Sequence, residues 1–255
     1  MPGPLHGFGR STFVDAVGKH WTYYSIGEGP PVMVLHEVYG LSPSDLSFCR
    51  RLSNAGFKVY APLLFGTPGK KVNFWEAFAY LGRVCVSGEF AAFAHNRSSP
   101  IAQVLRALGR EMIIGQQRPR FGVVGLCLTG NFALAMMADK NLLAPVVSEP
   151  ALPAALCKSA RQAIGLSSSE IATVNRRISE GIKILGFRFK SDIKSPKERF
   201  ETMRRVFGEG FEGHCIDRSP NFGNHSVFTQ DYDPNWTPTL EAFERLVGFL
   251  TARLS

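Results

Sequence analysis

The chain has 255 residues, of which 45% are hydrophobic and 20% charged, a composition typical of a globular protein with a substantial core. It contains no apolar run of membrane-spanning length, and its first residues lack the basic and apolar segments of a secretory signal, so neither a transmembrane helix nor export is expected. The formal net charge of +8 comes from dispersed basic residues without a nucleic-acid-reading motif, so we expect no nucleic acid and no membrane as partner.

Short apolar runs, which indicate buried strands, alternate along the chain with segments that carry helix start signals. Ser42 before Pro43 is typical of a helix start, capping boxes are expected at Ser167 and Ser195, and Thr237 is expected to cap the last helix. In chain order we predict a strand at 31–36, a helix at 42–55, a strand at 57–61, a helix at 99–114, a strand at 119–124, a helix at 131–138, a strand at 142–147, a helix at 167–180, a strand at 183–189, a helix at 195–207, a strand at 211–217 and a helix at 237–254.

This alternation predicts an α/β fold with one domain over residues 1–255. Because the strands are apolar throughout, we expect a mainly parallel central sheet with helices on both faces. Residues 1–20 are expected to be an N-terminal extension. Residues 67–97 are rich in aromatic side chains without a clean strand, so they form either local core or a lid that lines a pocket.

The sequence Gly-Leu-Cys-Leu-Thr-Gly at 125–130 places Cys127 between a predicted strand and a predicted helix. A cysteine at such a turn has the setting of a nucleophile elbow, which exposes the side chain at the end of the sheet and directs the first N–H groups of the helix at it. A helix N-terminus also favours the thiolate. The other cysteines lack this setting and are interpreted as core residues: Cys49, Cys85, Cys157 and Cys215. The total of five cysteines is odd and includes no C-x-x-C pair, which argues against disulfides or a zinc site and favours a cytoplasmic protein.

Other reactive side chains follow the predicted strands, and active sites of parallel sheets lie at the carboxyl ends of the strands. Glu37, Asp192 and His225 each come after a different strand, and the order nucleophile, acid, base is that of an α/β-hydrolase triad. Each has a rival interpretation: Glu37 as a solvated loop residue, Asp192 as a helix-entry residue and His225 as a loop histidine. His214 is an alternative base and Asp217 an alternative acid, and His36 is expected to end its strand in the core.

The sequence resembles the dienelactone hydrolase family over about residues 31–249. The resemblance rests on four motifs in order, namely His-Glu-Val-Tyr-Gly at 36–40, Gly-Leu-Cys-Leu-Thr-Gly at 125–130, Phe-Arg-Phe-Lys-Ser-Asp at 187–192 and Asn-His-Ser at 224–226. It implies an α/β-hydrolase fold and a catalytic triad of Cys127, His225 and Asp192. It also implies that Glu37 contacts the resting thiol and helps to generate the thiolate.

The resemblance further implies an oxyanion hole formed by the backbone N–H groups of Leu128 and Val38. Two departures from the family's pattern stand out. Thr129 occupies a position where the family often has a second glycine, and its β-branched side chain is expected to crowd the elbow. The arginine that dienelactone hydrolases place shortly after the histidine is missing from 226–229, which leaves Arg83 and Arg188 as candidates to bind a substrate carboxylate.

The leading hypothesis is therefore a hydrolase that cleaves a small-molecule ester or lactone through an acyl-thiol intermediate, without a metal or an organic cofactor. Two alternatives stay open. One alternative is a non-catalytic binding or regulatory protein on a retained hydrolase scaffold. The other is a protein with a redox-sensing thiol. The oligomeric state does not follow from the sequence.

Overall fold

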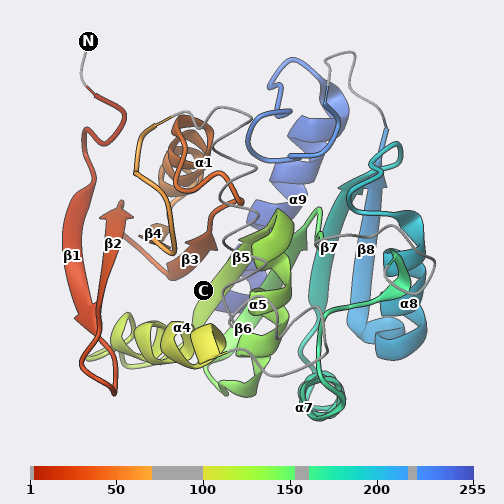
Figure 1. Cartoon of the computed structure of the whole chain (residues 1–255), viewed down its shortest axis with the longest axis horizontal. Helices are drawn as coiled ribbons and strands as arrows, with labels where there is room; N and C mark the ends of the chain where they lie inside the picture. The colour runs from red at the N-terminus through yellow and green to blue at the C-terminus, as the bar shows by residue number, and fades with distance from the viewer. Residues whose placement is uncertain (1–2, 71–99, 153–160, 218–222) are drawn as a thin grey trace.

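A mostly parallel sheet crosses the computed structural model, which describes residues 3–70, 100–152, 161–217 and 223–255 (Figure 1). In this part of the chain the sheet has eight strands in the order β1-β2-β4-β3-β5-β6-β7-β8. Strands β3 to β8 run parallel to one another, whereas β2 pairs antiparallel with both β4 and β1. The strands are β1 (Gly9–Val14), β2 (His20–Ile26), β3 (Pro31–Leu35), β4 (Lys58–Pro62), β5 (Phe121–Leu126), β6 (Leu142–Ser148), β7 (Ile184–Phe189) and β8 (Phe211–Ile216).

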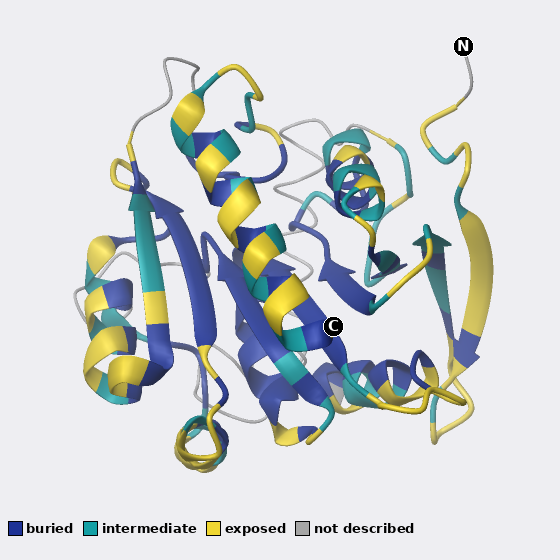
Figure 2. Cartoon of the chain, turned by 180° about the vertical axis from the view of Figure 1, so that it is seen from behind, coloured by how far each residue is buried: buried dark blue, intermediate teal, exposed yellow. Residues whose placement is uncertain are grey.

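Helices cover both faces of the sheet, which confirms the predicted α/β-hydrolase arrangement. The apolar side chains of α1 and α9 pack on one face, and those of α4, α5, α7 and α8 pack on the other. Figure 2 shows the central strands buried between them and α9 with its exposed side turned outward. The helices are α1 (Pro43–Asn54), α4 (Pro100–Glu111), α5 (Gly130–Ala135), α7 (Ser168–Ser179), α8 (Lys197–Phe207) and α9 (Thr237–Leu254), with single 3-10 turns η1 (Cys127–Thr129), η2 (Met136–Ala138) and η3 (Gly208–Gly210).

Two strands lie outside the set that the sequence predicted. β1 falls within the expected N-terminal extension, and β2 follows it as the second arm of a hairpin. Five of the six residues of β1 are exposed, so this strand lacks the apolar run that identified the others. The hairpin widens the sheet at the edge opposite β8.

The helix starts follow the predicted signals in part. Ser42 and Ser167 cap α1 and α7 and complete their capping boxes, as predicted. The predicted box at Ser195 is wrong, because α8 begins after Pro196 and the backbone of Ser195 bonds Asp192 and Arg188 instead. The N-cap of α9 is Trp236, without a side-chain cap bond, and not Thr237. Helix α4 ends at Glu111, three residues before the predicted end, and α5 passes into η2 after Ala135.

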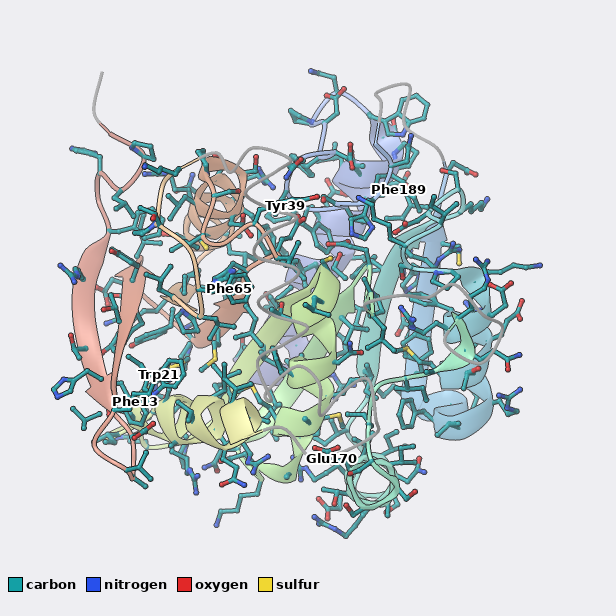
Figure 3. The ribbon with its side chains drawn as sticks, in the orientation of Figure 1. Phe13, Trp21, Tyr39, Phe65, Glu170 and Phe189 are labelled. Atoms are coloured by element: carbon teal, nitrogen blue, oxygen red, sulfur yellow. The ribbon has the colours of Figure 1, made fainter. Side chains whose placement is uncertain are left out.

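The carboxyl ends of the parallel strands meet at one end of the molecule. In Figure 3, Tyr39 and Phe189 lie toward this end, whereas Phe13, Trp21 and Glu170 lie toward the opposite one. The loops after β3, β5, β6, β7 and β8 are therefore neighbours.

Most of the aromatic segment 67–97, with Arg83 and Cys85, falls outside the described residues, as does Cys157. Within the described ranges, no helix combines the length and the hydropathy needed to cross a membrane.

Candidate active site

Cys127 occupies a sharp turn between β5 and α5. Its backbone φ is +53°, in the left-handed region that non-glycine residues rarely adopt. The turn depends on close contact between strand and helix, because a Cβ on Gly125 would lie 2.7 Å from the Thr129 carbonyl oxygen and 2.8 Å from the Gly130 Cα. This strained, glycine-dependent geometry is that of a nucleophile elbow.

Thr129 ties the elbow to the sheet instead of crowding it. Its side chain is fully buried, and its Oγ1 lies 2.9 Å from the Leu35 carbonyl oxygen and 2.7 Å from the Leu126 carbonyl oxygen. The same oxygen accepts a hydrogen bond from the Leu126 N–H at 3.1 Å. The hydroxyl thus joins β3, β5 and the turn, which the sequence-based expectation of crowding did not anticipate.

Three side chains from separate loops form a line at the carboxyl end of the sheet. The Nε2 of His225 lies 3.2 Å from the Cys127 Sγ, and its Nδ1 lies 2.7 Å from Oδ2 of Asp192. All three residues are buried, with exposed fractions of 5–7%. Asp192 is fixed in turn, since its Oδ1 accepts hydrogen bonds from the N–H groups of Lys194 and Ser195 at 2.9 and 3.1 Å.

The electrostatics of this line favour a proton on the imidazole. Burial alone would lower the pKa of His225, but Cys127 and Asp192 on its two sides outweigh burial and raise that pKa to about 12. The arrangement therefore favours a protonated imidazole at His225. A thiol that has given its proton to a neighbouring histidine is a strong nucleophile.

Arg188 holds the loop that carries Asp192. Its guanidinium donates to the carbonyl of Ser195 at 2.7 Å and to that of Asp192 at 3.0 Å, and only 3% of the residue is exposed. The side chain is thus engaged inside the protein, which corrects its candidacy as a carboxylate-binding residue. The other candidate, Arg83, lies outside the described residues.

Asp231 fixes the loop that carries His225. Its Oδ2 accepts hydrogen bonds from the N–H groups of His225 and Ser226, both at 2.9 Å. Gly223 sits at φ +120°, and a Cβ there would lie 2.5 Å from the Asp231 Oδ1. Asp192 therefore holds the ring of His225, and Asp231 holds its backbone.

The two N–H groups expected in an oxyanion hole lie in the loops after β3 and β5. The N–H of Val38 donates no hydrogen bond within the described part of the chain. Leu128 is the second residue of η1, at a position where helical N–H groups have no partner one turn earlier. Both donors are therefore placed in turns that leave backbone N–H groups for a ligand.

The model of the dienelactone hydrolase family matches residues 20–153, which is more than half of the chain. The chain belongs to the dienelactone hydrolase family. No curated protein sequence matches it.

Solved structures share the fold of this family member at low sequence identity. A Klebsiella pneumoniae protein provisionally named a dienelactone hydrolase aligns with a TM-score of 0.66 and 16% identity, over 96% of this chain and 98% of that one. An α/β hydrolase from Penicillium sp. aligns with a TM-score of 0.61 and 11% identity, over 100% and 99%. The thioesterase domain from the curacin biosynthetic pathway aligns with a TM-score of 0.57 and 13% identity, over 96% and 99%. These likenesses establish the α/β-hydrolase fold.

Glu37 of this family member is bonded to the histidine loop. Its carboxylate accepts a hydrogen bond from the Ser226 hydroxyl at 3.0 Å and another from the Thr229 hydroxyl. The contact between Glu37 and the thiol that the resemblance implies is not among the hydrogen bonds of the described residues, where Sγ is bonded to His225. The hydroxyls of Ser226 and Thr229 therefore hold the carboxylate in the stretch where the family's arginine is missing.

Glu149 and Asp45 are buried acids beside Glu37 that the sequence analysis missed. Glu149 follows β6 at φ +38°, and its Oε2 accepts hydrogen bonds from the Ser148 hydroxyl and from the Val227 N–H at 3.2 Å. Burial and the nearby Glu37 raise the pKa of Glu149 well above its ordinary value, and they raise that of Asp45 to about 7. The strand-end rule that found Asp192 applies equally to Glu149 and could have found it.

The rival residues lie elsewhere. His214 bonds the Glu212 carboxylate at 2.8 Å within β8, and the exposed Asp217 pairs with Lys190 at 2.6 Å.

His36 is fully buried, as predicted. Its ring accepts a hydrogen bond from the Leu64 N–H, and burial lowers its pKa to about 4. Cys49 is buried in the core as predicted, whereas Cys215 is half-buried, with its sulfur 3.8 Å from Nη1 of Arg188. In the described residues no group of three His, Cys, Asp or Glu side chains could hold a metal ion.

Proposed function

We propose that this member of the dienelactone hydrolase family cleaves esters or lactones through Cys127, His225 and Asp192. The observation that carries the proposal is the single hydrogen-bonded line from Sγ through the imidazole to the carboxylate, starting at a strained elbow. A nucleophile, a base and an orienting acid in this order are the elements of acyl transfer.

In the proposed reaction, the Cys127 sulfur attacks the carbonyl carbon of the ester. The oxygen that becomes negative receives hydrogen bonds from the N–H groups of Val38 and Leu128. The imidazolium of His225 gives its proton to the departing alcohol oxygen, which leaves an acyl group on the sulfur. His225 then takes a proton from water, the resulting hydroxide attacks the acyl carbon, and the acid departs as the sulfur is regenerated.

Glu37 has a supporting role in this proposal. Its carboxylate is bonded to Ser226 and Thr229, so it holds the loop that carries His225. For Glu37 to accept the thiol proton, as the family resemblance implies, it would first have to leave both hydroxyls. We therefore assign acceptance of the thiol proton to His225, which already contacts the sulfur.

Hydrolysis of p-nitrophenyl acetate tests the nucleophile. We expect Cys127→Ala to lower kcat/KM by about a thousandfold or more, because removal of a triad nucleophile leaves only binding and the oxyanion donors. Wild-type protein quenched during turnover is expected to carry one acetyl group on the peptide that contains Cys127, as seen by mass spectrometry.

Cys215→Ser is the matched control, since Cys215 lies in β8 and its sulfur accepts a hydrogen bond from Nη1 of Arg188, at 3.8 Å, instead of contacting His225. Its rate is expected to stay within about twofold of wild type. Equal rates for Cys127→Ala and wild type would overturn the assignment. An unreactive Cys127 with no turnover of any ester would instead support a binding protein on a hydrolase scaffold.

A further inference from the structure

Arg199 is a fully buried arginine in the first turn of α8. Burial lowers the pKa of its guanidinium to about 10, whereas the nearby Cys127 and Asp192 act to raise that pKa. The side chain therefore stays positively charged at neutral pH. A buried charge is costly unless neighbouring groups stabilise it, so the groups that contact the Arg199 guanidinium are informative.

Among the described residues, two backbone carbonyls receive hydrogen bonds from this guanidinium. Nη1 donates to the Pro150 carbonyl oxygen and Nε to that of Ala163, both at 2.7 Å. The peptide group that begins with the Pro150 carbonyl ends with the Ala151 N–H, and this N–H donates to the Cys127 carbonyl oxygen at 3.0 Å. One peptide group thus links the guanidinium to the backbone of Cys127.

This linkage acts in two ways. A cation on the carbonyl side of a peptide polarises the group and strengthens its N–H as a donor, which helps to hold Cys127 at its unusual φ. The positive charge also interacts with Cys127 and with the buried Asp192, which is hydrogen-bonded to the histidine beside the thiol. A cation this near the sulfur favours its negative form.

We propose that Arg199 is a positioning residue that holds the elbow through the Pro150–Ala151 peptide and stabilises the thiolate of Cys127 by its charge. The proposal rests on the proposed function in that it takes Cys127 as the reacting group. Its readout is the ionisation of the thiol and does not depend on turnover.

The rate of Cys127 alkylation by iodoacetamide, measured against pH by mass spectrometry of the peptide that contains Cys127, tests this role. Arg199→Lys and Arg199→Gln each keep one donor nitrogen in the side chain, but only lysine keeps the charge. We expect the midpoint of the alkylation profile to stay near wild type in Arg199→Lys. In Arg199→Gln it should rise by about one pH unit, which lowers the rate about tenfold at a fixed pH below the midpoint.

The titratable groups at the sulfur and its histidine, namely His225, Asp192 and the nearby acids Glu37 and Glu149, are unchanged in both variants. Arg177→Gln is the control for loss of a buried arginine, because Arg177 also donates to two backbone carbonyls, those of Lys140 and Leu142, at the far end of β6. Its alkylation profile is expected to match wild type.

An unshifted midpoint in Arg199→Gln overturns the proposal. If that variant does not fold, a midpoint raised by one unit in a folded Arg199→Lys overturns it, since the charge is then still present. These outcomes are separate from failure of the proposed function, which is full ester hydrolysis by Cys127→Ala.

Discussion

The hydroxyl of Thr129 stabilises the backbone of the elbow. A glycine at this position would leave the turn free of side chains, whereas the threonine Oγ1 bonds backbone groups of Leu35 and Leu126. The side chain therefore joins the strand before Glu37 to the turn that carries Cys127. Its contribution is in the hydroxyl rather than in the methyl group.

Substitution at Thr129 separates these two parts. Thr129→Val keeps the shape but removes the hydroxyl, and we expect it to destabilise the fold by about 1–3 kcal/mol, because buried backbone groups lose their partner. Thr129→Ser keeps the hydroxyl, and loss of one methyl is expected to cost about 1 kcal/mol. Urea unfolding measures both, and a valine variant as stable as the serine variant would contradict the assigned role.

At the scale of elements, the site depends on how closely α5 approaches β5. Gly125 lies where the strand meets the first turn of the helix, and a Cβ there would come within 3.0 Å of the Ala133 Cβ as well as of the turn backbone. Only glycine fits at this position without moving the helix α5 that follows the elbow. The position of Cys127 is thus set by the contact between two elements.

Gly125→Ala is therefore expected to lower kcat for ester hydrolysis by at least about tenfold, because a small shift of a reacting atom has a large effect on rate. It should also lower the unfolding midpoint in urea. Gly248→Ala is the control, since no atom lies within 4 Å of a Cβ there and alanine in a helix is expected to stabilise by about 0.5–1 kcal/mol. Unchanged kcat in the Gly125 variant would show that the helix can move without cost to the site.

The loops carry the acids, and their predictability differs. Asp192 and His225 could be placed from the sequence because apolar strands precede them and loops at strand ends converge. Glu149 follows an equally apolar strand, but the Pro150 next to it resembles an ordinary turn. Ser195 matched a capping box, yet its backbone groups are bonded to Asp192 and Arg188, and such long-range bonds leave no local signal.

For the whole molecule, the predicted alternation of strands and helices was right because the central strands β3, β5 and β7 are buried on both faces. The hairpin of β1 and β2 was missed because an exposed edge strand lacks an apolar run. A chain with a net charge of +8 also places several acids in its interior. The burial of these acids makes the stability of the fold dependent on pH.

Glu149 provides the test of this dependence. Because its pKa is raised in the folded state, the folded protein holds a proton that the unfolded chain releases above about pH 4.5, the ordinary value for glutamate. The stability that this proton gives is complete below that pH and is lost as the pH rises. Glutamine has no such proton, so the unfolding free energy of Glu149→Gln minus that of wild type should rise with pH, by at most about 1.4 kcal/mol per unit.

Urea unfolding between about pH 5 and pH 8 measures this difference. Glu209→Gln, at an exposed position in η3, is the control, and its difference from wild type should stay flat. A difference for Glu149→Gln that falls with pH would mean that the buried side chain is ionised in the folded protein.

The sequence separation of 98 between Cys127 and His225 also has a consequence for the order in which the protein is made. A ribosome that has released the chain as far as β7 has delivered the thiol and its elbow but no base. Asp231, which holds the histidine loop in place, comes later still. Under the proposed function, the sulfur therefore has no base throughout most of synthesis, and it gains one only when the chain after β8 docks on the sheet.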